Sequence, residues 1–312
     1  MSRAGIVIVT YNSANVIGKC LDGALETGAE VVVVDNASSD RTAYEVTRRS
    51  VRLIANGENR GFAGAVNQGV RALDTPFVLL LNPDAVLRTG IDDLIRACER
   101  PHAAGAGGKL VSPNGSPQTG FFVRDLPTAA ALVCEALLLN RLWPRNPINR
   151  RYRRLDFDDS RAQEVEQPAG ALLMIRRDVW ERLGGFDARF HPLWFEDVDF
   201  CKRAGDLGYT FYYSPNTEAQ HTGAHSIFSI SLGQRQLYWY GSLLTYSAAH
   251  FTAGRHRMVC AAVAAGAVIR MLFECVARRS LAPFKVYGKV VAMAASRLRY
   301  PPAGVHRSER NL

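Results

Sequence analysis

The chain has 312 residues, of which 47% are hydrophobic, enough to bury a full core in one large domain or in one domain with an appendage. The net charge of +9 lies in the last fifth: residues 1–249 contain 27 Lys and Arg and 27 Asp and Glu, whereas residues 250–312 contain 11 Lys and Arg and two acids. The six cysteines lack a Cys-x-x-Cys pair and regular spacing, which argues against a disulfide framework or zinc site and favours reduced thiols in the cytosol.

The first 110 residues alternate β-branched apolar runs with helical stretches. We expect strands at 6–9, 30–35, 51–55, 77–81 and 104–111, and helices at 14–26, 41–49, 62–73 and 90–100. The short apolar run at 5–9 passes directly into polar residues, unlike a signal peptide. Short strands separated by helices are typical of βαβ units, so the predicted fold is α/β with a doubly wound, mainly parallel sheet. Ligands bind such sheets at the carboxyl ends of the strands.

The second half has a different rhythm. Residues 113–165 are predicted to form a long irregular insertion, with six Arg between 141 and 154. Beyond it we expect a strand at 165–175, a helix near 178–183, an acidic helix at 195–207, a strand at 210–214, and helices from 229 to the end that Pro283 interrupts. The predicted domains are 1–228, in halves 1–112 and 113–228, and a helical basic region 229–312.

Two strand ends carry a carboxylate. Asp35 closes a run of four valines and can accept hydrogen bonds from a nucleobase or a ribose, although the polar residues after it would also cap the next helix. Asp84 follows three leucines, Asn82 and Pro83. A carboxylate there can hold a divalent ion, Mg²⁺ or Mn²⁺, that bridges the phosphates of a departing nucleoside diphosphate. The alternative for Asp84 is a solvated turn.

Asn59, Gly61 and Phe62 open a glycine-spaced helix. A helix entrance of this kind favours a phosphate, and Gly61 lets backbone approach a ligand closely, but tight helix–sheet packing explains the glycines equally well.

A second acidic cluster lies among large apolar side chains. Glu196, Asp197 and Asp199 follow Trp194 and Phe195 at a predicted helix start. Mutual repulsion raises some of their pKa values, which suits proton acceptance from a hydroxyl. The alternative is an acidic first turn that interacts with the helix dipole. His221, in a later loop, is a candidate for completing a metal site or for a structural role.

Six segments in order carry a family resemblance. They are Val9-Thr10-Tyr11-Asn12, Val34-Asp35-Asn36-Ala37-Ser38-Ser39-Asp40, Asn59-Arg60-Gly61-Phe62, Leu81-Asn82-Pro83-Asp84, Gly184-Gly185-Phe186-Asp187 and Phe195-Glu196-Asp197-Val198-Asp199. Together they closely resemble the inverting GT-A glycosyltransferases of family two, particularly the rhamnosyltransferase-like branch. The likeness covers residues 4–250. Asn82 stands where many members of the family have the first Asp of an Asp-x-Asp motif.

The resemblance implies a role for each matching residue. Asp197 would be the catalytic base, with Glu196 and Asp199 as alternates, and Asp84 and His221 would hold Mg²⁺ or Mn²⁺. The acceptor would lie near Gly170, Ala171, Trp194 and Glu196. The implied nucleotide-sugar site comprises Thr10, Tyr11, Asn12, Asp35, Asn59, Gly61, Phe62, Asn67, Asn82 and Asp84.

The implied activity is transfer of a sugar from a nucleotide diphosphate sugar to a saccharide or polyprenyl-diphosphate-linked acceptor in cell-surface polysaccharide synthesis. The Asn-Pro-Asp form favours dTDP-rhamnose as donor; galactofuranose or N-acetylglucosamine donors, and a non-catalytic nucleotide-sugar-binding protein, are the alternatives. The donor, the acceptor linkage and the oligomeric state are not defined by the sequence.

The basic tail predicts an anionic partner. The apolar run at 258–273 is interrupted by Arg270 and followed by many Lys and Arg, which favours an amphipathic anchor in the plane of a membrane over a spanning helix. A helical bundle with a solvated basic side is the alternative. No nucleic-acid motif accompanies the tail, so we expect no nucleic acid as partner. The expected location is cytoplasmic, peripheral on the inner face of the cell membrane. The arginines at 141–154 would bind a lipid diphosphate or pair with Asp156, Asp158 and Asp159.

Overall fold

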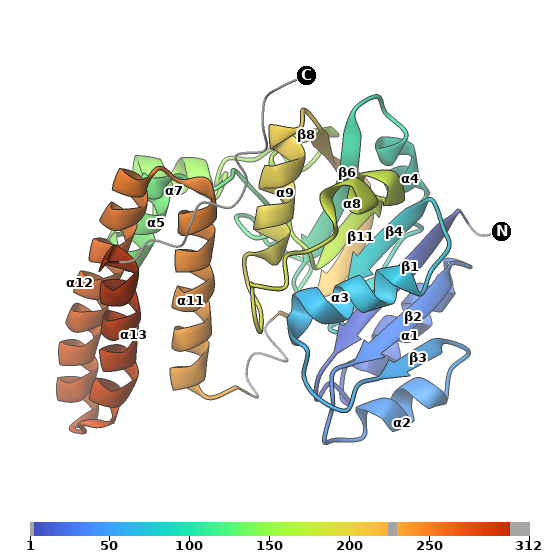
Figure 1. Ribbon diagram of the computed structural model, residues 1–312. Helices are drawn as coiled ribbons and strands as arrows, with labels where there is room; N and C mark the ends of the chain where they lie inside the picture. The colour runs from blue at the N-terminus through green and yellow to red at the C-terminus, as the bar shows by residue number, and fades with distance from the viewer. Residues whose placement is uncertain (1–2, 224–229, 300–312) are drawn as a thin grey trace. The chain divides into compact units, whose positions relative to one another are not determined.

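A computed structural model describes residues 3–223 and 230–299, which belong to two compact units (Figure 1). One unit contains Met1–Leu126 and Arg151–Ile230, and the other contains Pro127–Arg150 and Ser231–Leu312. The units differ from the predicted domains in one segment, since residues 127–150 belong to the helical unit. The predicted boundary at 228–229 and the predicted helical residues 300–312 lie outside the described residues.

The first unit is built on a mixed nine-stranded sheet whose order is β3-β2-β1-β4-β10-β6-β11-β5, with β8 paired to β11. Strands β1, β2, β3 and β4 are parallel, β10 is antiparallel to both β4 and β6, and β11 is parallel to β6. The doubly wound, mainly parallel α/β prediction is confirmed. The main strands are β1 (Ala4–Thr10), β2 (Glu30–Asp35), β3 (Arg52–Ala55), β4 (Phe77–Leu81), β5 (Ala85–Leu87), β6 (Ala103–Val111), β8 (Gln163–Val165), β10 (Leu172–Arg176) and β11 (Thr210–His221).

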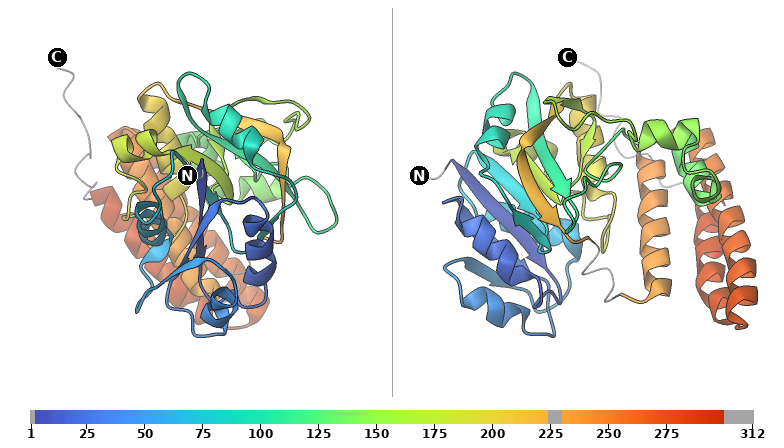
Figure 2. Two further views of the ribbon diagram at one scale, coloured as in Figure 1. Left: turned by 90° about the vertical axis from the view of Figure 1, so that its right-hand side faces the viewer. Right: turned by 180° about the vertical axis from the view of Figure 1, so that it is seen from behind.

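Helices cover both faces of this sheet. Helices α3, α8 and α9 lie on the face turned to the viewer in Figure 1, and α1 comes into view from behind in Figure 2. The valines of β2 and the leucines of β4 are buried, as expected for central parallel strands that are covered on both sides. The helices of this unit are α1 (Ile17–Leu25), α2 (Thr42–Thr47), α3 (Gly61–Arg71), α4 (Asp92–Cys98), α8 (Arg177–Leu183) and α9 (Glu196–Asp206).

Strand ends from distant parts of the sequence meet at one edge of the sheet. Thr10 pairs with Asp35 at the ends of β1 and β2, Leu81 at the end of β4 pairs with Leu172 at the start of β10, and His221 at the end of β11 pairs with Ala85. The expected convergence of strand ends is therefore present. All six cysteines are among the described residues and are free, and five are buried.

The sequence prediction was wrong in three stretches. The expected irregular insertion at 113–165 contains helices α5 (Ala129–Ala136), α6 (Leu139–Leu142) and α7 (Pro147–Tyr152), and the two-residue strand β7 (Val123–Arg124). The strand expected at 165–175 is divided, because residues 169–171 turn between β9 (Gln167–Pro168) and β10. The strand expected at 210–214 continues to His221, where β5 pairs with it.

The second unit is helical. Helix α11 (Leu232–His250) packs with α12 (Ala253–Arg278) and α13 (Ala282–Arg299), and α12 and α13 form an antiparallel hairpin (Figure 1). Pro283 lies in the first turn of α13, where a proline without an N–H is tolerated. Helix α5 packs against α12 at Gly266, where a Cβ would lie 2.0 Å from the Ala136 carbonyl oxygen. The predicted helical character of this region is confirmed for the described residues.

Candidate active site

Asp84 and His221 meet at the sheet edge. Asp84 follows β4 and is buried, and its Oδ1 lies 3.3 Å from Nε2 of His221, which is also buried. The backbone completes the contact, because Thr222 N–H donates to the Asp84 carbonyl at 3.1 Å. Asn82 Nδ2 lies 3.4 Å from the same His221 nitrogen. A carboxylate oxygen and an imidazole nitrogen thus converge, although the sequence separates them by more than a hundred residues.

His221 is held by two residues that sequence reasoning missed. Gln118 Nε2 donates to the His221 carbonyl at 2.7 Å, which leaves Gln118 Oε1 to accept from His221 Nδ1 at 3.0 Å. This pairing puts the ring proton on Nδ1 and leaves a lone pair on Nε2, the nitrogen beside Asp84. The ring of Phe121 stacks on the imidazole with centroids 5.3 Å apart. A metal-binding histidine usually donates its other ring N–H to an acceptor that fixes its tautomer, and the Gln118 amide oxygen provides such an acceptor here.

This pair is small for a metal site. Within residues 3–223 and 230–299, no three His, Cys, Asp or Glu side chains gather closely enough to hold an ion. The donor set nevertheless fits Mg²⁺ or Mn²⁺, which commonly take one or two protein ligands and complete their coordination with substrate phosphates and water.

Asp197 lies at the second residue of α9, and backbone donors fix its carboxylate. Oδ2 accepts from Gly170 N–H at 2.9 Å and Oδ1 from Val198 N–H at 2.8 Å. Gln167, buried in β9, donates to Oδ2 at 3.3 Å and was also missed from the sequence. Burial raises the pKa of Asp197, and the hydrogen bonds from Gly170 and Val198 oppose the increase.

Two series of contacts connect Asp197 with the Asp84–His221 pair. Gly170 donates to Asp197, and the carbonyl of the next residue, Ala171, accepts from Asn82 N–H at 3.1 Å. On the other side, the guanidinium of Arg124 lies 5.7 Å from the ring centroid of Phe121, the ring that stacks on His221.

The charge of Arg124 also lowers the pKa of Asp197 against the larger effect of burial. The carboxylates of Asp84 and Asp197 therefore belong to one region of the first unit, and the predicted acceptor residues Gly170 and Ala171 lie between them.

The start of α9 is strained. Trp194 and Phe195 both have left-handed backbone angles, with φ of 77° and 72°, which is costly for large side chains with a Cβ. The turn buries Glu196, and among the described residues its Oε2 has no hydrogen-bond partner. Burial raises the pKa of Glu196 well above its ordinary value, and the neighbouring Asp197 raises it further.

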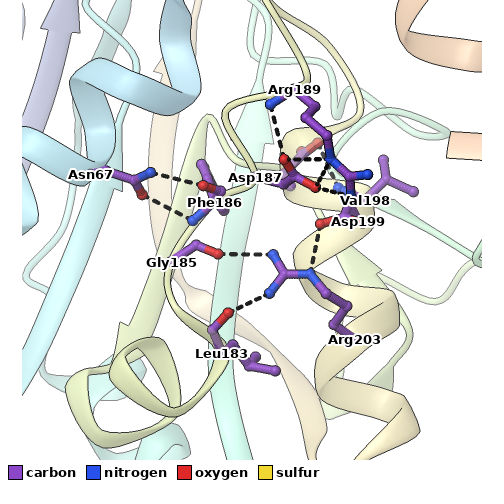
Figure 3. A network of polar contacts seen from close by, with 10 residues as sticks. Asn67, Leu183, Gly185, Phe186, Asp187, Arg189, Val198, Asp199 and Arg203 are labelled. Atoms are coloured by element: carbon purple, nitrogen blue, oxygen red, sulfur yellow. Dashed lines mark hydrogen bonds and ion pairs between the residues drawn. The ribbon is translucent and has the colours of Figure 1, made fainter. Parts of the chain in front are cut away.

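The third acid of the cluster has a structural partner. Asp199 Oδ2 forms a 2.7 Å ion pair with Nε of Arg203, one helical turn later. The other two nitrogens of Arg203 donate to the carbonyls of Leu183 and Gly185, each at 2.8 Å (Figure 3). This network ties α9 to the segment after α8 and so supports the turn that presents Glu196 and Asp197.

Asn67, predicted to contact the nucleotide sugar, is hydrogen-bonded to the same segment after α8. Its Nδ2 donates to the Phe186 carbonyl at 2.8 Å and its Oδ1 accepts from Phe186 N–H at 2.9 Å (Figure 3). Phe62 lies near Phe186, with ring centroids 6.4 Å apart. Through these contacts, Asn67 and Phe62 join α3 to the segment after α8.

Four of the predicted nucleotide-sugar residues, Thr10, Tyr11, Asn12 and Asp35, lie at the ends of β1 and β2. Asp35 is buried and accepts from the N–H and the hydroxyl of Ser38. Asn12 donates its N–H to Ser38 Oγ at 2.9 Å and accepts from Ser39 N–H at 2.8 Å. Thr10 is buried, and among the described residues its Oγ1 has no hydrogen-bond partner. The loops after the two strands form a preorganised polar rim, with Tyr11 partly exposed on it.

Asn36 joins this rim to the loop before α3. Its Nδ2 donates to Asn59 Oδ1 at 3.2 Å and to the Gly61 carbonyl at 3.1 Å, and its Oδ1 accepts from Arg60 N–H at 3.1 Å. Gly61 needs its missing side chain, because its φ is +74° and a Cβ would lie 2.7 Å from His191 Nδ1. One signal in the sequence indicated that Asn36 belongs to the site, namely its position directly after Asp35.

The arginine-rich segment pairs with an acid that was not predicted. Arg151 and Arg154 each lie 3.7 Å from a carboxylate oxygen of Asp125. Of the acids expected as partners, Asp158 pairs with Arg161 and Asp159 with Lys109. Asp125 is therefore a partner of Arg151 and Arg154 that the sequence did not indicate. Arg141 and Arg145 are exposed on the second unit.

Glu196→Gln is expected to stabilise the protein at high pH. Because folding raises the pKa of Glu196, the stability that the group contributes is fully present below the ordinary pKa of a glutamate and decreases as pH rises toward the folded value. A neutral amide removes that loss. We expect Tm to rise by about 2–4 °C at pH 8 for each kcal/mol recovered, and to match wild type at pH 4. Thermal melts across this range check it; an equal difference at every pH would contradict the assignment.

Comparison with known proteins agrees with the geometry. The family model described as "Glycosyl transferase family 2" matches residues 5–184, and the one described as "Glycosyl transferase family group 2" matches residues 148–295. The N-acetylglucosaminyl-diphospho-decaprenol L-rhamnosyltransferase of Mycobacterium tuberculosis is 33% identical over 239 residues, which cover 71% of this chain and 76% of the relative. Rhamnosyltransferase WbbL of Escherichia coli is 26% identical, over 70% of this chain and 83% of the relative.

Among solved structures, the mannosyltransferase PcManGT from Pyrobaculum calidifontis, in complex with GDP-Man and Mn²⁺, aligns with a TM-score of 0.51 and 18% identity. The alignment covers 96% of this chain and 88% of that one, and it supports the fold alone.

The sheet has the GT-A fold, and the family match identifies a glycosyltransferase. The chain belongs to glycosyl transferase family 2, in its rhamnosyltransferase-like branch.

Proposed function

We propose that this glycosyltransferase moves L-rhamnose from dTDP-rhamnose, with inversion, to a saccharide or polyprenyl-diphosphate-linked saccharide in cell-surface polysaccharide synthesis, at the inner face of the cell membrane. The proposed sugar and acceptor are supported by the rhamnosyltransferase relatives, one of which is named for a diphospho-decaprenol-linked acceptor. The observation that carries the chemistry is the chain of contacts from Asn82 through Ala171 and Gly170 to Asp197.

The nucleotide lies at the ends of β1 and β2 in this proposal. Thr10 Oγ1 and the carboxylate of Asp35 face the base and ribose, and the hydrogen bonds among Asn12, Ser38 and Ser39 hold the rim in place before the ligand arrives. A preorganised rim loses little conformational entropy on binding.

Asp84 and His221 would hold the divalent ion. When bound, the ion stabilises the negative charge of the departing nucleoside diphosphate as a Lewis acid. Asp84 supplies a carboxylate oxygen, His221 supplies the lone pair on Nε2, and Gln118 keeps the ring proton on Nδ1.

Asp197 accepts the proton of the attacking hydroxyl. Inversion needs the base on the side of the sugar away from the diphosphate. Asp197 meets this need in the proposal because Gly170 lies between it and Asp84. Two backbone N–H donors aim the carboxylate, while burial raises its pKa and so makes it a stronger base than a solvated aspartate. Trp194 and Glu196, on the strained turn, border the acceptor side.

Gln118→Ala is expected to weaken ion binding without unfolding the protein. The substitution removes the partner that selects the tautomer of His221, and loss of such outer partners costs about 10–100-fold in metal affinity. Electron paramagnetic resonance of free Mn²⁺, titrated with dTDP present, measures the change. The matched control is Gln220→Ala, because Gln220 precedes His221 on β11 but its side chain contacts Arg88. Wild-type Mn²⁺ affinity in Gln118→Ala would rule out this role.

A panel of nucleotide sugars tests the proposed function. Each donor is incubated with the protein and a GlcNAc-diphospho-lipid acceptor, with and without Mn²⁺, and the released nucleotide is separated and measured by ultraviolet absorbance. We expect acceptor-dependent release of dTDP from dTDP-rhamnose above all other donors. Preferred release from UDP-galactofuranose or UDP-N-acetylglucosamine would replace the donor, and binding without release from any donor would favour a non-catalytic protein.

A further inference from the structure

Helix α12 has two different faces. Its buried face, formed by Val259, Cys260, Val263 and Ala267, packs within the helical unit. The opposite face is exposed and apolar over about four turns. Its members recur at helical spacing and comprise Ala261, Ala265, Val268, Ile269, Leu272, Phe273 and Val276.

The apolar surface continues around the α12–α13 turn. Phe273 is 69% exposed, Val276 79% and Leu281 79%, and Phe284 at the start of α13 is also exposed. Exposed apolar patches of this extent mark interaction surfaces in soluble proteins. We call this surface the α12 face; it consists of the seven residues above together with Leu281 and Phe284.

Exposed cations border the α12 face at both ends. Arg255 and Arg257 lie at the start of the helix, and Arg279 and Lys285 lie at the turn, with Lys289 one turn further along α13. Among residues 250–299, Glu274 is the only acid, and its Oε1 accepts a hydrogen bond from Tyr287 at 2.6 Å. In an anionic membrane, the apolar strip would meet the acyl chains and the basic residues at its two ends would meet the lipid phosphates.

A second copy of the chain fits this face less well. Because both ends are basic, pairing two α12 faces in either direction brings cations against cations, which opposes association. Anionic lipid phosphates compensate the charge at both ends at once.

Helix α12 is held as part of its unit. On length and composition alone, Ala253–Ala277 is apolar enough to cross a membrane, since an 18-residue window within it has a mean hydropathy of 2.0. Arg270, however, donates to the carbonyls of Ala136 at 2.6 Å and Glu135 at 3.2 Å on α5. A spanning helix would have to break these contacts and carry Arg270 into the bilayer.

We propose that the α12 face is a membrane-docking surface on which α12 lies in the plane of an anionic bilayer. Phe273, Val276, Leu281 and Phe284 enter the acyl boundary, and Arg279 and Lys285 contact lipid phosphates. The inference rests on the proposed function, and deepens it, by naming where the transferase meets the lipid that carries its acceptor.

Vesicle co-sedimentation of the full chain tests the surface. The probes are vesicles of phosphatidylglycerol with phosphatidylcholine, and vesicles of phosphatidylcholine alone. We expect binding to the anionic vesicles only, weakened by salt, and at least about a tenfold lower partition coefficient for Phe273→Ser/Val276→Ser. Both side chains are largely exposed, so these substitutions remove little packing.

Charge reversal gives a second, independent variant. Arg279→Glu/Lys285→Glu should lose anionic-vesicle binding, whereas Arg48→Glu/Arg71→Glu, with the same change in charge at exposed sites of the other unit, should keep it. No pelleting of the intact chain, equal pelleting with both vesicle types, or unchanged binding by both α12-face variants would overturn the proposal. A dimer in sedimentation velocity that Phe273→Ser/Val276→Ser dissociates would identify a second copy as the occupant.

A soluble assay separates this inference from the function. Nucleotide release with a short water-soluble acceptor should be the same in wild type and in the α12-face variants. Turnover without vesicle binding would leave the transferase proposal in place and end the docking proposal. Vesicle binding without turnover by any donor would do the reverse.

Discussion

Asp197→Asn is expected to abolish sugar transfer while leaving donor binding nearly unchanged. The amide keeps the size of the side chain but cannot take a proton from the acceptor hydroxyl, and loss of a general base costs about 10²–10⁴-fold in rate. The residues proposed to bind the donor, Thr10, Asp35 and Asp84, are untouched. Nucleotide release measures the rate, and calorimetry with dTDP-rhamnose measures the binding.

The matched control is Asp178→Asn, the same chemical change at an exposed aspartate that pairs with Arg176. It should transfer sugar at the wild-type rate. If Asp197→Asn turned over normally, the base would have to be another group. Glu196 would then be the first candidate, because it is buried beside Asp197 and its pKa is raised.

Asp84→Asn is expected to have a comparably large effect through the ion. The substitution removes the charged oxygen beside His221 Nε2, so Mn²⁺ affinity in the presence of dTDP should fall by at least about tenfold, with a matching loss of transfer at low Mn²⁺. Titration of Mn²⁺ by paramagnetic resonance, followed by rates across the same concentrations, checks both.

Partial rescue by high Mn²⁺ would support an ion role for Asp84. A variant with wild-type Mn²⁺ affinity and a lost rate would instead assign Asp84 to the sugar or to folding. Asp93→Asn, on α4 away from the strand ends, serves as the control for a lost carboxylate.

The sheet and its strand ends were predictable because the signals are local. The four valines of β2 and the leucines of β4 are continuous apolar runs, and such runs are typical of strands buried on both faces. The direction of β10 was not predictable from its sequence, because a continuous apolar run has no preferred sense. Helices α5 and α6 were missed because the prolines and glycines before them and the arginines after them led residues 113–165 to be taken as one irregular insertion, although residues 129–142 contain neither proline nor glycine.

The residues proposed to carry the chemistry were identified from the motifs, but their hydrogen-bond partners could not be. Gln118 contacts His221 across 103 positions, and Gln167 contacts Asp197 across 30, so no spacing rule connects them. Asp199 is different: Arg203 lies four residues later on the same helix, a spacing that indicates an ion pair and a structural role.

The strained turn before α9 explains how the carboxylates of Glu196 and Asp197 are held in fixed positions. Left-handed angles at Trp194 and Phe195 persist only where the surroundings enforce them, and the Asp199–Arg203 network supplies that support. The turn buries Glu196 and directs Asp197 toward Gly170. Position and protonation of the proposed base therefore depend on one short segment.

The most direct test is a crystal structure of Asp197→Asn with dTDP-rhamnose and Mn²⁺, with the ion located by its anomalous scattering. We predict an anomalous peak at Asp84 and His221, and the anomeric carbon of the sugar between that peak and residue 197. A nucleotide sugar bound elsewhere, or a sugar whose anomeric carbon faces away from residue 197, would contradict the account.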